Sequence, residues 1–288
     1  MKKKWGIWIV AILLGCAILE AAIWFKYKDR LLIDLESTRK NDWDYSIPLT
    51  TNLQNWVHKG DLVLVNTSYA IRPEGVKKDI ITLADEDELN SGFVLLDRNM
   101  MLSRHVAKQF QKMTTAAAEE GVHSFLMSSG YRDLDKQDEL YQEKGAEYAL
   151  PAGYSEHNSG LSLDIGSSLT TMDEAPEGEW LEKNAWKYGF ILRYPRDKVE
   201  ITGIQYEPWH FRYVGLPHSA IMYKKHLVLE QYLQLLREKK EISCTLDDHN
   251  YNIRYYPLDS ETTIYVPRKD SYEISGDNME GIIVTASD

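Results

Sequence analysis

Two histidines and one aspartate are the residues with the clearest chemical potential in this sequence. His157 and Asp164 stand seven positions apart, and His210 follows later in the chain. Two imidazoles and one carboxylate make an open zinc site, because a fourth position is left for water. Glu207, three residues before His210, offers a carboxylate that could take a proton from that water. The set indicates a metallohydrolase, although a lone histidine or aspartate is more often structural.

The flanking residues predict extended segments around two of these ligands. Residues 161–165 alternate apolar and polar side chains, so the aspartate faces away from the apolar side of a strand. Residues 209–214 alternate in the same way and put His210 and Arg212 on one face. Pro208 disfavours a helix there, because proline fixes φ and has no N–H donor. The second histidine is therefore expected on a strand.

An arginine motif is a further candidate for chemistry. Arg132 closes the sequence Ser129-Gly130-Tyr131-Arg132, directly after a predicted strand at 125–127. A guanidinium there would present a planar fork to a carboxylate or to a developing oxyanion. Taken alone, the motif is better explained by a solvated arginine at a turn.

Periodicity and turn residues predict a mixture of helices and strands. Helices are expected at 104–120, 133–144, 180–188 and 217–240. Strands are expected at 62–65, 125–127, 161–165, 190–192, 209–214, 251–256, 263–266 and 281–285. From residue 242 onwards the pattern contains only short strands between turns.

The order of these patterns predicts four segments. They are a transmembrane anchor at 1–27, a stalk or linker at 28–59, a catalytic domain at 60–241 and a small β appendage at 242–288. Residues 5–25 are predominantly apolar, with Glu20 as the only charge, and about 20 apolar residues span a bilayer. The span is longer than the apolar core of a typical signal peptide, but small residues inside it leave cleavage open.

The distribution of charge argues against nucleic acid as a partner. The chain has 288 residues and a formal charge of −11. Its first 30 residues carry six basic and two acidic side chains, which leaves −15 on the remainder. Such an acidic body repels polyanions. The two cysteines, Cys16 and Cys244, lack the spacing of a zinc knuckle, so a thiolate metal site is excluded.

Three motifs, in this order and spacing, resemble those of one peptidase family. They are Ser-Gly-Tyr-Arg ending at Arg132, Ser-x-His-x-x-Gly-x-x-x-Asp ending at Asp164, and Glu-Pro-Trp-His ending at His210. Together they look like the VanY-type D-alanyl-D-alanine carboxypeptidases, which are LAS metallopeptidases. The similarity runs from Leu62 to Lys240. It implies an α+β fold with a central antiparallel sheet flanked by helices, in addition to the N-terminal transmembrane helix and the C-terminal β appendage.

The resemblance also implies one Zn²⁺ per chain and a role for seven residues. The zinc ligands would be His157, Asp164 and His210, and Glu207 would be the catalytic base. Arg132 would contact the substrate and stabilise the oxyanion, with Ser155 and Gln137 as further substrate-binding residues. Because water is the nucleophile at such a site, no serine acyl-enzyme is expected.

The implied reaction removes the C-terminal D-Ala from peptidoglycan precursor pentapeptides, a role linked to vancomycin resistance. This substrate places the catalytic domain outside the cytoplasm, on a single-pass membrane anchor. One alternative is a D,D-dipeptidase or a peptidoglycan endopeptidase with the same zinc site. Another is a non-catalytic zinc-binding cell-wall module, which would have no need of Glu207 as a base. The sequence leaves open whether a terminal D-lactate or D-serine is accepted.

Overall fold

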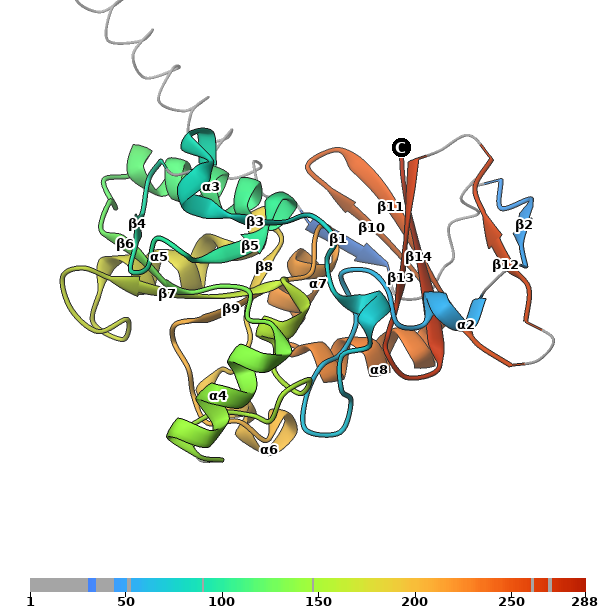
Figure 1. The fold of residues 1–288 in the computed structure, drawn as a ribbon. Helices are drawn as coiled ribbons and strands as arrows, with labels where there is room; N and C mark the ends of the chain where they lie inside the picture. The colour runs from blue at the N-terminus through green and yellow to red at the C-terminus, as the bar shows by residue number, and fades with distance from the viewer. Residues whose placement is uncertain are drawn as a thin grey trace, which may run out of the picture.

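Two five-stranded sheets with their own helices make up the described part of the chain (Figure 1). The computed structural model describes residues 31–34, 44–50, 53–89, 91–146, 148–259, 262–268 and 271–288. The site sheet has the strand order β4-β6-β7-β9-β8, and the C-terminal sheet has the order β1-β10-β11-β14-β13. Two smaller sheets pair β3 (Ile80–Thr82) with β5 (Met101–Ser103) and β2 (Ile47–Leu49) with β12 (Ile264–Val266).

The site sheet is antiparallel except at one edge, where β4 runs parallel to β6. Its strands are β4 (Val94–Leu95), β6 (Phe125–Ser129), β7 (Ser162–Ser167), β8 (Phe190–Leu192) and β9 (His210–Tyr213). Alternate side chains of these strands enter one hydrophobic core, including Met127, Leu163 and Phe211. The opposite face carries the polar side chains and is therefore free to form a site.

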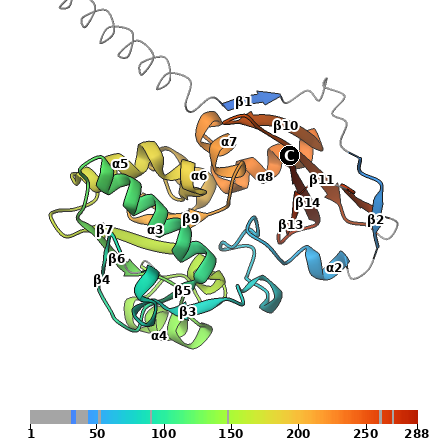
Figure 2. The same ribbon diagram turned by 90° about the horizontal axis from the view of Figure 1, so that it is seen from above.

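Helix α3 (Arg104–Glu119) covers the core face of the site sheet, and Figure 2 shows it crossing the strands. The Ser103 side chain caps its first turn by accepting the Val106 N–H. Val106, Phe110 and Met113 recur at helical spacing and are fully buried. Helix α5 (Pro176–Asn184) contributes Trp180 to the same core, whereas α4 (Leu134–Lys144) lies across from α3 in Figure 1.

A second hydrophobic core joins the C-terminal sheet to helices that precede it. The elements are α7 (His218–Lys225), α8 (Leu229–Lys239), β10 (Glu241–Leu246), β11 (His249–Pro257), β13 (Ser271–Gly276), β14 (Gly281–Ser287) and β1 (Leu31–Asp34). Ile221 and Leu236 pack there with Ile253 and Ile283. The strands that we expected as a small appendage therefore share a core with α7 and α8, and residue 241 does not separate two cores.

Short elements complete the described chain. They are α2 (Leu53–Trp56), α6 (Val199–Thr202) and the 3₁₀ turns η1 (Pro73–Gly75), η2 (Leu83–Asp85), η3 (Asp87–Leu89), η4 (Glu156–Ser159), η5 (Ala185–Tyr188) and η6 (Arg196–Lys198). β1, β2 and α2 all fall inside the stretch 28–59, and β1 and β2 pair with β10 and β12. These residues were expected to form a stalk, but the described part of this stretch joins the C-terminal half of the fold.

Two expected elements are wrong. Residues 62–65 are buried but form no strand, and their side chains alternate between the two cores, with Val63 in the first and Leu62 and Leu64 in the second. Their backbone groups are satisfied instead by distant partners, as the Val63 carbonyl accepts a bond from Arg212. The helix expected at 217–240 is split into α7 and α8. It breaks at His226, which has a φ of 53°.

The predicted membrane span at residues 5–25 lies outside the described residues. Within the described part, no helix is both long and apolar enough to cross a bilayer.

A buried histidine links α7 to the C-terminal sheet. His218 Nδ1 lies 2.7 Å from the Tyr232 hydroxyl of α8, and its Nε2 lies 3.1 Å from Thr285 Oγ1 of β14. Burial lowers the pKa of His218 to about 3, so the native imidazole stays neutral in mild acid. The unfolded chain takes up a proton at this histidine at much higher pH, near the ordinary value of 6.5.

This difference predicts a stability that decreases with acidification. Below pH 6.5 the unfolded state binds a proton that the native state does not, so the free energy of unfolding should fall by up to about 1.4 kcal/mol per pH unit from this group. Urea titrations of the wild type and His218→Gln between pH 7.5 and 4.5 would measure it. The variant should be less stable at pH 7.5 but lose less stability towards pH 4.5. Equal losses in the two proteins would contradict the assignment.

Candidate metal centre and active site

The pairing of β7 with β9 brings two of the predicted ligands together. Asp164 and His210 are directly opposed in the antiparallel register. Directly opposed residues share one face of a sheet and have Cβ atoms about 5 Å apart. Their neighbours Leu163 and Phe211 point into the core on the other side. Hydrophobic alternation and strand register thus place a carboxylate and an imidazole side by side on the polar face.

The third ligand reaches the same place from a short 3₁₀ turn, η4. Ser155 caps this turn by accepting the His157 N–H, and His157 Nδ1 lies 2.7 Å from the Gly130 carbonyl. Because a carbonyl only accepts, Nδ1 carries the proton and Nε2 keeps its lone pair. A Cβ at Gly130 would lie 2.2 Å from the Met101 carbonyl oxygen, so this close approach requires glycine.

The three side chains form a donor set that fits a divalent metal ion. Ligand atoms of His157, Asp164 and His210 all lie within 4.8 Å of one another. His157 Nε2 stands 3.4 Å from Asp164 Oδ2, and His210 Nδ1 stands 3.2 Å from Asp164 Oδ1. Asp164 Oδ1 is buried without hydrogen-bond geometry to any described partner. The lone pair of His157 Nε2 faces the Asp164 carboxylate, whose Oδ1 is unsatisfied, and a cation bound between these groups would stabilise the arrangement.

The electrostatics of the cluster suit such an ion. Burial alone would raise the pKa of Asp164, but His157 and His210 hold it well below its usual range. Burial lowers the pKa of His157 and so favours its neutral, metal-binding form. Burial also acts to lower the pKa of His210, yet Asp164 and Glu156 raise it to about 9. Metal binding would therefore release the Nδ1 proton of His210.

Glu207 lies beside this cluster without being part of the ligand set. Its Oε2 is 3.6 Å from His210 Nδ1, and the side chain is partly exposed. Burial raises the pKa of the Glu207 carboxyl, and the nearby Asp164 carboxylate adds to the rise. A carboxylate with a raised pKa next to a metal-bound reaction centre is suited to accepting and returning a proton.

All seven site residues expected from the sequence line one cleft of about 290 Å³. Arg132 Nη2 donates to Ser155 Oγ at 3.5 Å, and its buried Nε has no hydrogen-bond partner among the described residues. Gln137 is buried, and its Nε2 donates to the Leu150 carbonyl at 2.7 Å, while its Oε1 finds no described partner. Arg132 and Gln137 thus line the cleft, and each keeps one buried polar atom without a hydrogen-bond partner among the described residues.

Several cleft residues were not expected from the sequence. Tyr194 and Trp209 line the cleft, and the Tyr194 ring centroid lies 4.9 Å from that of His210. Glu156 lies directly beneath the ligands and is fully buried. For two of these residues the sequence offered one signal, which is adjacency to a predicted ligand: Glu156 precedes His157, and Trp209 precedes His210. Nothing in the local pattern, however, indicates that a glutamate in a loop is buried.

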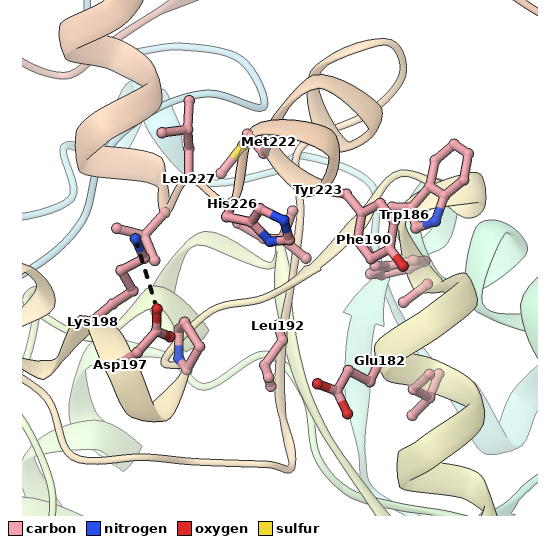
Figure 3. A pocket seen from close by; sticks show the side chains of 15 residues that line it. Glu182, Trp186, Phe190, Leu192, Asp197, Lys198, Met222, Tyr223, His226 and Leu227 are labelled. Atoms are coloured by element: carbon pink, nitrogen blue, oxygen red, sulfur yellow. Dashed lines mark ion pairs between the residues drawn. The ribbon is translucent and has the colours of Figure 1, made fainter. Parts of the chain in front are cut away.

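A second cavity, of about 210 Å³, has a different character (Figure 3). It is lined by residues of α5, η5, β8 and α7, including Trp186 and Met222, and by His226, which follows α7. Asp197 and Lys198 form its one marked ion pair in Figure 3, at 3.9 Å. No predicted ligand or base reaches this cavity, so the chemistry belongs to the cleft.

Fold and site together define a metallopeptidase-type centre on a mixed α/β fold. A family profile described as VanY, D-alanyl-D-alanine carboxypeptidase, matches residues 99–216. A D-alanyl-D-alanine carboxypeptidase of Enterococcus faecium is 59% identical over 235 residues, covering 82% of this chain and 78% of the relative. The bifunctional D-Ala-D-Ala dipeptidase and carboxypeptidase VanXYC of Enterococcus gallinarum is 38% identical over 159 residues, covering 49% of this chain and 82% of the relative.

Solved structures agree with these relatives. The vancomycin-resistance D,D-dipeptidase VanXYg, in complex with a D-Ala-D-Ala phosphinate analogue, matches with a TM-score of 0.71 and 28% identity over 90% of this chain and 99% of its own. A D,D-pentapeptidase VanY from a VanB-type cassette, solved as a mutant in complex with Zn(II), matches with a TM-score of 0.50 and 32% identity over 60% of this chain and 98% of its own. The chain belongs to the VanY family of D-alanyl-D-alanine carboxypeptidases, which confirms the resemblance seen in its motifs.

The donor set predicts that loss of one imidazole abolishes tight metal binding. His157→Ala should leave two of three protein ligands, and the purified variant should retain little zinc after dialysis against a weak chelator. Metal content by atomic emission spectrometry would measure this. His249→Ala, which removes an exposed histidine of β11, is the matched control and should keep the wild-type content. Full zinc occupancy in His157→Ala would show that the ligands lie elsewhere.

Proposed function

We propose that this chain is a zinc-dependent D-alanyl-D-alanine carboxypeptidase that removes the terminal D-Ala from peptidoglycan precursor pentapeptides. The observation that carries the proposal is the cleft that combines the three-ligand cluster with Glu207 and Arg132. The names of its relatives supply the substrate class, since the Enterococcus faecium protein is a D-alanyl-D-alanine carboxypeptidase. One zinc ion per chain matches the single described cluster of metal-type side chains.

Bound zinc would polarise the scissile carbonyl and lower the pKa of water from 15.7 to about 7. His157, Asp164 and His210 would hold the ion, and Glu207 is the group that moves the proton. Its carboxylate takes a proton from the attacking water and delivers it to the nitrogen of the departing D-Ala. The raised pKa of Glu207 helps the first half of this transfer, because a more basic carboxylate accepts the proton of the water more readily.

Arg132 provides the positive charge for the substrate. It is the one arginine or lysine among the described residues that line the cleft. Its planar guanidinium can bond a carboxylate or the developing oxyanion through two parallel N–H groups. Ser155, which shares a hydrogen bond with Arg132, and Gln137, which holds the Leu150 carbonyl, would orient the peptide backbone.

A second candidate activity is cleavage of free D-Ala-D-Ala. Two similar proteins favour it, because VanXYg is a D,D-dipeptidase and VanXYC is bifunctional. Both reactions break the same bond, so the zinc ligands and Glu207 would act alike. The two differ in how much peptide must fit before the scissile bond, and a direct comparison of dipeptide and pentapeptide as substrates separates them.

We further propose that residues 1–27 anchor the chain and that the catalytic cleft faces the outside of the membrane. The support is the apolar stretch at 5–25 and the chemistry of the substrate, which is exposed on the outer surface. Removal of terminal D-Ala there would lower the amount of vancomycin target. A reporter active only outside the cytoplasm, fused to the C-terminus of the full chain, should give signal, and an inactive fusion would reverse the orientation.

The role of Glu207 predicts a variant that binds metal but does not turn over. Glu207→Gln keeps the size of the side chain and removes its basicity, so kcat should fall by about 10²–10⁴-fold. D-Ala release from a muramyl pentapeptide, followed by mass spectrometry with the purified full-length protein, would measure the loss. Zinc content should remain at the wild-type level, and a chelator should stop the wild-type reaction. Near-native turnover by Glu207→Gln would exclude this residue as the base.

A further inference from the structure

A fully buried carboxylate lies behind the metal ligands and has no part in the chemistry described so far. Glu156 precedes His157 in η4, and its side chain is completely inaccessible. Its Oε1 accepts from Arg193 Nε and from Arg212 Nη1, each at 2.8 Å. Its Oε2 accepts from Ser162 Oγ at 3.1 Å and faces His210 Nε2 at 3.4 Å. The four lone-pair sites of this carboxylate are thereby used, so it has none to offer a metal.

This contact determines which nitrogen of His210 is available. An ionised carboxylate can only accept hydrogen bonds, so the His210 nitrogen that faces it, Nε2, must carry a proton. The other nitrogen, Nδ1, then points at Asp164 and Glu207, at 3.2 and 3.6 Å. A neutral imidazole with its proton on Nε2 has its lone pair on Nδ1, where the ligand cluster is.

We propose that Glu156 is a positioning residue of the metal centre, which holds His210 with Nε2 protonated and Nδ1 presented to the ion. The inference rests on the proposed zinc site and adds a residue that touches neither metal nor substrate. His157 receives the equivalent support from the Gly130 carbonyl, which takes its Nδ1 proton and leaves Nε2 for the ion. The two imidazoles would therefore bind through different nitrogens, each selected by the acceptor behind it.

The surroundings of Glu156 explain how a charge can be held there. Arg193 is also bonded through both terminal nitrogens to Glu230 of α8, and Arg212 donates to the carbonyls of Asp61 and Val63. Two arginines and two glutamates balance in charge, and all but Glu230 have fully buried side chains. The network ties η4, β9 and α8 together, so the carboxylate cannot rotate away from His210 without breaking several charged bonds.

A purely structural network is the competing explanation. In that case Glu156 would only neutralise Arg193 and Arg212. Removal of either carboxylate of the network, Glu156 or Glu230, would then have the same effect on stability and on zinc affinity. Glu230 offers the comparison, since it bonds Arg193 from the far side and contacts no metal ligand. The two explanations differ in zinc affinity and in the state of His210, which loss of stability alone does not alter.

The test compares Glu156→Gln with Glu230→Gln in the full-length protein. The amide of Glu156→Gln can still accept from both arginines through its oxygen, but it presents an NH₂ donor to His210 Nε2 and so favours the wrong tautomer. Zinc affinity, from competition with a chromophoric chelator, should weaken about 10–100-fold. Glu230→Gln should lose thermal stability while keeping its zinc affinity within about twofold. Unchanged affinity in Glu156→Gln, or equal weakening in both variants, would overturn the proposal.

A measurement on the wild type covers the case in which Glu156→Gln does not fold. In ¹⁵N-histidine NMR spectra of the zinc-loaded protein, His210 should show a protonated Nε2 and a metal-bound Nδ1, and His157 the reverse. Binding of His210 through Nε2 would refute the role of Glu156 directly. These readouts do not require turnover, so a protein that binds zinc in this way but releases no D-Ala would overturn the proposed function and leave this inference standing.

Discussion

The antiparallel register between β7 and β9 is the constraint on which the site depends. Because side chains alternate across a strand, a slip by one residue would bury Asp164 or His210 and expose Leu163 or Phe211. Packing of the apolar set against α3 makes such a slip unfavourable. The ligand geometry is therefore a consequence of the hydrophobic core, and two of the three metal-type side chains are in place before any ion binds.

The remaining groups of the site come from irregular segments and are held by polar bonds instead of apolar packing. His157 is fixed through the Gly130 carbonyl, and the Asn158 side chain donates to the Arg132 carbonyl at 2.7 Å. Arg132 N–H in turn bonds the His157 carbonyl, so the arginine loop and the histidine turn hold each other. Glu156 adds a charged anchor below them. Such support keeps functional side chains in one geometry on segments that would otherwise be mobile.

The C-terminal sheet contributes to the same support from a distance. Asn278, in the turn between β13 and β14, donates its side-chain amide to the carbonyls of Leu64 and Ala70. The adjacent Ile71 N–H bonds the Gly153 carbonyl at 2.7 Å, in the loop that leads to Ser155. The second core extends this connection through α7 and α8. The last strands of the chain are thus part of the structure behind the cleft, although the core that they share is the one with α7 and α8.

The local sequence pattern was enough to predict much of this protein, because side chains that share one face of a helix or a strand lie only two to four residues apart in the sequence. The alternation around His210 predicted β9, the spacing from Val106 to Met113 predicted α3, and the three motifs identified the family. Burial of charge was beyond local pattern, since the partners of Glu156 are Arg193 and Arg212, far along the chain. The break at His226 and the strandless burial of residues 62–65 were hidden for the same reason. The sequence alone thus determined the residue types of the site, whereas only the tertiary structure decided which nitrogen, oxygen or carbonyl each of them faces.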